Sequence, residues 1–169
     1  MLQLNKRTEY GLIALVHLVD RAGEPVSVRE LSERYPVPRR LLAEVLKDLT
    51  RAHMVESHRG SQGGYTLASP PEAISLGQII TALEGAPALA NCDAPAVLKQ
   101  GGCDVQPTCP IRSPIQRVHE HLWELLDRTS LRSLSEDRSR RARGPAAHES
   151  PITDRATSQV SPVTPASIR

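Results

Sequence analysis

Three helix-like segments followed at once by a glycine-rich hairpin constrain this chain more than any other feature. Apolar residues recur at helical spacing in residues 6–21 and 38–51, and a capping box of Ser27 with Glu30 opens residues 27–35, which together indicate three helices. Two short β-like runs, 54–58 and 65–68, then flank an Arg-Gly-Ser-Gln-Gly-Gly sequence that is typical of a hairpin tip. Helix, helix, short turn, helix and two-stranded hairpin is the element order of a winged helix–turn–helix.

Two further helices are expected beyond the hairpin. Residues 76–84 have Ser75 as N-cap, Gln78 completing a capping box, and Gly85 just past the end. A last helix, residues 113–134, opens with Ser-Pro and carries a continuous apolar stripe. The stripe consists of Ile115, Val118, Leu122, Leu125 and Leu126. Because this helix lies beyond the compact core, its stripe is predicted to pack against a second subunit.

Composition and patterning divide the chain into four parts. The 169 residues are 2% aromatic and include no Phe, which favours a small aliphatic core over a large β-sandwich or barrel. From residue 135 the chain is rich in Ser, Pro, Arg, Ala and Thr, which predicts a disordered tail. We therefore expect a mainly α fold with a small β-hairpin. Its parts are a winged helix–turn–helix (1–85), a cysteine-containing loop (86–112), a dimerisation helix (113–134) and the tail (135–169).

A cytoplasmic location is expected from the start of the chain and from its cysteines. Residues 1–7 lead straight into an amphipathic helix with no secretory cleavage site, and the longest apolar run, 12–19, is too short to span a bilayer. Thiols stay reduced in that compartment, and three cysteines is an odd number, so a disulfide framework is disfavoured. An enzyme is not expected either, since no nucleophile has a placed base and no glycine loop joins a strand to a helix.

Basic residues on the third helix and the hairpin tip predict contacts with double-stranded DNA. The net charge of +2 is only mildly basic, so local placement matters more than the total. The third helix would lie in the major groove and the glycine-rich tip would approach the backbone or the minor groove. Any one basic side chain alone fits a solvated surface; the ordered combination favours DNA. The predicted contact residues are Arg39, Arg40, Lys47, Arg51, Arg59, Gly60, Ser61 and Gln62.

Several motifs in the expected order carry a resemblance to a known family. They are Leu-Asn-Lys-Arg-Thr-Glu-Tyr at 4–10, Leu-Ser-Glu-Arg at 31–34, the hairpin sequence 58–65, Ser-Leu-Gly-Gln-Ile-Ile at 75–80, and three cysteines before a final helix. Residues 1–134, about four-fifths of the chain, resemble the Rrf-type family of bacterial transcription regulators, which includes IscR-like and NsrR-like iron–sulfur sensors. The resemblance implies a homodimer that binds a palindromic operator, with the late helix as the dimer interface.

The three cysteines are expected to hold an iron–sulfur cluster, [2Fe–2S] or [4Fe–4S], that controls operator binding. Ten residues separate Cys92 from Cys103 and five separate Cys103 from Cys109, which is too open for a zinc knuckle. IscR-like members have a histidine three residues after the last cysteine, where this chain has Arg112. Other members use a carboxylate on the first helix of the partner subunit, which matches Glu9 here.

Two alternatives accompany the cluster. Glu9 also fits the role of an ordinary first-turn helix carboxylate, and His119 and His121 on the last helix are reserve ligands. A regulator of the same fold that senses through its thiols without a metal is the second alternative. Iron and sulfide content of protein purified without oxygen would separate these two sensors.

Overall fold

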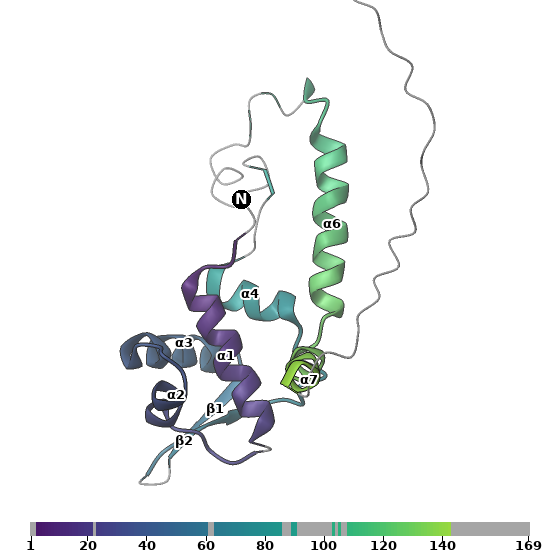
Figure 1. Ribbon diagram of the computed structural model, residues 1–169. Helices are drawn as coiled ribbons and strands as arrows, with labels where there is room; N and C mark the ends of the chain where they lie inside the picture. Colours follow the sequence, from purple (N-terminus) through teal and green to yellow (C-terminus); the bar gives the residue numbers. More distant parts are fainter. Residues whose placement is uncertain are drawn as a thin grey trace, which may run out of the picture.

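The computed structural model describes residues 3–21, 23–60, 63–85, 89–90, 103, 105 and 108–142. Helices α1, α2 and α3 come first, followed by the two strands and then by α4, α6 and α7 (Figure 1). Their bounds are α1 Lys6–Asp20, α2 Val28–Arg34, α3 Arg39–Arg51, β1 Val55–His58, β2 Gly64–Leu67, α4 Leu76–Glu84, α6 Arg112–Arg128 and α7 Leu131–Ala142. The mainly helical winged helix–turn–helix is confirmed.

Helix α1 is the centre of the core. It packs against α3, α4 and α7, and its residues Ala14, Leu15 and Leu18 are buried. Aliphatic side chains of α3 and α4 complete the cluster, as the near absence of aromatic residues requires. Close approach of α4 depends on Gly11, because a Cβ there would lie 2.5 Å from Leu83 Cδ1. The core therefore fixes α3 and α4 against the same helix.

The hairpin is anchored to the turn between α1 and α2. Strands β1 and β2 are antiparallel, and Tyr65 exchanges two backbone hydrogen bonds with Val26 at 2.9 and 3.0 Å. A Cβ on Gly64 would lie 2.6 Å from the Val26 backbone, so glycine permits β2 to pair with Val26 as well as with β1. The wing consequently has a fixed position relative to the helix–turn–helix.

Local capping signals place the helix ends. Ser75 caps α4, its hydroxyl accepting from the Gln78 amide while the Gln78 side chain accepts from the Ser75 amide. The predicted capping box and the bounds 76–84 are confirmed. Asn5 caps α1 by accepting from the Thr8 amide at 2.9 Å. In the described part of the chain, no helix is both long and apolar enough to cross a membrane.

The end of the described chain corrects two predicted boundaries. Helix α6 spans Arg112–Arg128 with Ile111 as an N-cap that makes no side-chain bond, rather than starting after a Ser113 cap and running to residue 134. A separate helix, α7, follows α6 and occupies Leu131–Ala142. The prediction of a disordered tail from residue 135 is therefore wrong for the residues up to Ala142.

Helix α7 is stabilised by contacts with residues distant in the sequence. Leu131 is fully buried and its amide donates to the Ile74 carbonyl at 2.8 Å, while Ser135 is also buried. The remaining tail, 143–169, lies outside the described residues.

Candidate DNA interface and cysteine segment

The exposed face of α3 carries the predicted basic residues. At 3.6 residues per turn, Arg40, Lys47 and Arg51 fall within one narrow stripe. The buried side chains Leu42, Val45, Leu46 and Leu49 occupy the opposite face. The side chain of Arg40 is 93% exposed, and Lys47 and Arg51 are exposed as well. Burial of one face therefore directs this cationic stripe to the surface.

Each arginine of α3 is paired with a carboxylate. Arg39 reaches Glu33 of α2 at 3.5 Å and the Ser32 hydroxyl at 3.0 Å. Glu33 also accepts from Arg29, and that hydrogen bond lowers the pKa of its carboxyl and keeps it ionised. Lys47 has no ion-pair partner among the residues that the structure describes. Binding of phosphates by these arginines therefore requires an exchange of partners.

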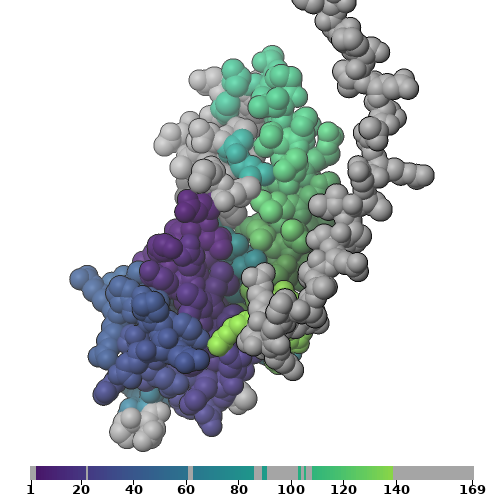
Figure 2. Space-filling model, viewed as in Figure 1, coloured from purple at the N-terminus to yellow at the C-terminus, as the bar shows by residue number. Residues whose placement is uncertain are grey.

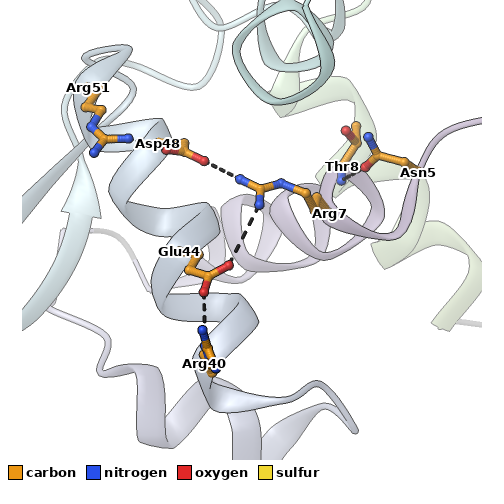
Figure 3. A network of polar contacts seen from close by, with 7 residues as sticks. All are labelled: Asn5, Arg7, Thr8, Arg40, Glu44, Asp48 and Arg51. Atoms are coloured by element: carbon orange, nitrogen blue, oxygen red, sulfur yellow. Dashed lines mark hydrogen bonds and ion pairs between the residues drawn. The ribbon is translucent and has the colours of Figure 1, made fainter.

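The carboxylates paired with Arg40 and Arg51 also bind a residue of α1 (Figure 3). Glu44 accepts from Arg40 Nε at 3.2 Å and lies 3.8 Å from an Arg7 terminal nitrogen. Asp48 accepts from Arg51 at 2.7 Å through one oxygen and from Arg7 through the other. The five side chains form a row of alternating charge that links the first turn of α1 to the exposed face of α3.

The wing presents Arg59 and Gly60 at its tip. Both are exposed, and Gly60 has φ of +116°, a conformation that favours glycine. The Gly63 amide closes the turn by donating to the Gly60 carbonyl at 3.0 Å. Ser61 and Gln62, also predicted to contact DNA, lie outside the described residues.

Helix α6 carries an unburied apolar stripe. None of its residues is buried, and Figures 1 and 2 show it rising beyond α4 and past the end of α1. Ile111 at its N-cap, and Val118 and Leu125 within it, are spaced seven residues apart and are 61%, 56% and 63% exposed. A heptad repeat of exposed apolar residues is typical of a helix that pairs with another helix.

Two of the three predicted thiol ligands are described. Cys103 and Cys109 are free, half-buried thiols that precede α6, and Cys92 lies outside the described residues. Within the described part of one chain, no three His, Cys, Asp or Glu side chains are grouped so as to hold a metal ion. Arg112, at the IscR-like histidine position, is the exposed first residue of α6.

The predicted carboxylate ligand lies on the first turn of α1. Glu9 accepts from Lys6 Nζ at 2.5 Å on the protein surface. This hydrogen bond raises the pKa of Lys6, because the carboxylate stabilises the charged ammonium. The reserve ligand His119 stacks on Trp123 with ring centroids 6.2 Å apart, a contact within α6.

Comparison with known families decides the identity of the fold. A family model described as Rrf2, iron-dependent transcriptional regulator, matches residues 4–137. The chain belongs to the Rrf2 family.

Solved structures of Rrf2-type regulators agree with this assignment. One is that of CymR (YrzC), the global cysteine regulator of B. subtilis, at 29% identity and a TM-score of 0.63, covering 81% of this chain and 98% of that one. Another is T. potens IscR, at 29% identity and a TM-score of 0.62, covering 81% and 88%. The oxidized form of Staphylococcus aureus CymR has 26% identity and a TM-score of 0.58, covering 80% and 97%. This Rrf2-family chain therefore has the fold of a transcription regulator.

Sequence reasoning on this Rrf2-family chain missed the acidic half of the interface. Glu44 stands four residues from Arg40 and Asp48 stands three residues from Arg51, spacings from which both ion pairs could have been predicted. Arg7 gave no such signal, because its contact with Asp48 spans 41 residues of sequence.

Proposed function

We propose that this chain binds a palindromic DNA operator as a homodimer and that an iron–sulfur cluster controls the binding. The observation that carries the DNA part is the exposed cationic stripe of α3, which lies opposite the buried face of that helix. The wing, anchored through Val26, adds an exposed Arg59 at its tip. A helix presented in this way fits the major groove, and an arginine at a glycine-rich tip suits a phosphate or a narrow minor groove.

The dimer part rests on α6. Val118 and Leu125, with Ile111 at the N-cap, leave apolar surface in water at heptad spacing unless another helix covers it. A second copy supplies an identical stripe, and two-fold symmetry would place two reading helices on paired half-sites. The proposed interface is therefore α6 against α6 of the partner subunit.

The cluster part rests on the chemistry of the donors. Iron–sulfur clusters take thiolate ligands, and Cys103 and Cys109 are free and half-buried; Cys92 would be the third. Glu9 of the partner subunit would be the fourth, a hard oxygen donor that exchanges more readily than a thiolate. When bound, the cluster would supply an iron site open to oxidants or nitric oxide. The iron-dependent description of the family and the likeness to IscR support an iron–sulfur cluster as the cofactor.

Metal-free thiol sensing is the second candidate. Its support is the free state of Cys103 and Cys109 and the likeness to CymR, which has been crystallised in an oxidized form. The DNA-binding part of the proposal is common to both candidates, so it can be tested first and separately.

The test of DNA binding is a fluorescence-anisotropy titration of the dimer on DNA from its own promoter region, over a range of salt concentrations. Replacing Lys47 or Arg59 by Gln should weaken binding and reduce the salt slope by about one for each lost phosphate contact. Arg21→Gln is the matched control, because it removes one exposed charge at the end of α1, outside α3, the wing tip and α6. Affinity equal to that of a scrambled duplex, or equal losses in all three variants, would contradict the proposal.

A further inference from the structure

We propose that Arg7, on α1, is a positioning residue for DNA binding that holds Glu44 and Asp48 so that Arg40 and Arg51 are free to bind phosphates. The inference rests on the proposed function, since it concerns the α3 stripe. Arg7 itself lies on a different helix from the residues it serves, and no contact between Arg7 and DNA is required.

The geometry assigns Arg7 a shared pair of carboxylates. Its two terminal nitrogens point to two acidic side chains one helical turn apart on α3, Glu44 and Asp48 (Figure 3). Each carboxylate gives its other oxygen to an α3 arginine, Glu44 to Arg40 and Asp48 to Arg51. Arg40 and Arg51 are the cations of this row that could reach DNA. The carboxylate paired with each of them is therefore also bound by Arg7.

Exposure separates the two kinds of arginine in this row. The side chains of Arg7 and Asp48 are 39% and 24% exposed, whereas that of Arg40 is 93% exposed. Ion pairs that are more exposed are weaker and easier to exchange. A phosphate would therefore displace the Arg40 and Arg51 pairs before the pair between Arg7 and Asp48.

The charge of the row explains why such an anchor is needed. Glu44 and Asp48 are negative groups on or beside the surface that would face phosphates, where they oppose binding. Once Arg40 or Arg51 turns to a phosphate, Arg7 still compensates the carboxylate left behind. Three arginines against two carboxylates leave one positive charge, and without Arg7 the row is neutral.

The alternative view is that Arg7 only holds α1 against α3. The two views predict opposite effects of Asp48→Asn on DNA affinity. If the tie alone matters, Asp48→Asn should weaken DNA binding as Arg7→Gln does. If Arg7 compensates charge, Asp48→Asn should strengthen binding, because it removes a negative group and releases Arg51.

The experiment measures operator affinity, salt slope and thermal stability for wild type, Arg7→Gln, Arg7→Lys, Asp48→Asn and the double variant of Arg7→Gln with Asp48→Asn. Arg21→Gln and Glu24→Gln are controls that make the same charge changes in an exposed ion pair outside α3, the wing tip and α6. We expect Arg7→Gln to weaken binding about tenfold at low salt, with the loss shrinking as salt screens the row. Arg7→Lys and the double variant should restore most of the affinity.

The outcomes separate this inference from the function on which it rests. A wild-type protein that binds no operator overturns both. Wild-type binding with no loss in Arg7→Gln, or with weaker binding by Asp48→Asn, overturns the role of Arg7 and leaves the proposed function standing. A loss in Arg7→Gln that Arg7→Lys restores, together with tighter binding by Asp48→Asn, supports it even if the melting temperatures differ.

Discussion

Replacing Leu125 by Glu should break the proposed dimer with little effect on the folded protomer. Full burial of a leucine side chain is worth about 1.5–3 kcal/mol. Because Leu125 is 63% exposed, about 1–2 kcal/mol remains to be gained per protomer in an interface. Two-fold symmetry doubles this to about 2–4 kcal/mol, which raises the dimer dissociation constant roughly 30- to 1,000-fold. Burial of the new carboxylate adds to the loss.

Sedimentation equilibrium over a range of concentrations measures this constant directly. Gln116→Glu is the matched control, because residue 116 is also exposed on α6 but lies on the far side from Val118 at 3.6 residues per turn. We expect Gln116→Glu to remain dimeric where Leu125→Glu is monomeric, with both unfolding at similar temperatures. Equal association of the two variants would show that this stripe is not the interface.

Three substitutions test the fold itself by chemical denaturation. Leu131→Ala should cost about 2–5 kcal/mol, because this first side chain of α7 is fully buried, and a loss near zero would mean that α7 is not docked. Ser75→Ala should cost about 1 kcal/mol by removing the hydroxyl that accepts from the Gln78 amide; an unchanged stability would argue against the capping box. Gly11→Ala should cost about 1–3 kcal/mol by forcing Leu83 away, and a stabilised variant would contradict the close contact of α1 with α4.

Local signals in the sequence were sufficient for the elements of the helix–turn–helix and the wing. Ser75 and Gln78 specify the start of α4 by themselves, since both partners of the capping box lie within four residues. The hairpin ends agree with prediction to one residue, because the glycine-rich tip and the flanking β-branched and aromatic residues act over short range.

Helix α7 could not be predicted in this way because its stability comes from distant residues. Its sequence is rich in Arg and Ser, and only Leu131 and Leu134 are apolar at helical spacing. Burial of Leu131, together with the Arg132 contact to Glu72 at 2.7 Å, supplies the stabilisation. Such a contact, 60 residues away in sequence, leaves no local pattern.

The candidate site was likewise predicted in part. The basic residues of α3 followed from the apolar periodicity of the same helix, which fixes what remains outside. The partner of Asp48 on α1 did not follow, because a contact of Arg7 with α3 depends on how two helices cross. The departure at Arg112 from the IscR-like histidine was visible in the sequence alone.

The most direct test of cluster control is one anaerobic preparation on which iron, acid-labile sulfide and operator affinity are all measured. The affinity is measured again after the iron is removed by a chelator with the thiols kept reduced. We predict stoichiometric iron and sulfide and an affinity change of about fivefold or more on removal, both absent in Cys103→Ser. Iron-free protein that binds its operator and responds only to thiol oxidation would contradict the cluster and favour thiol sensing.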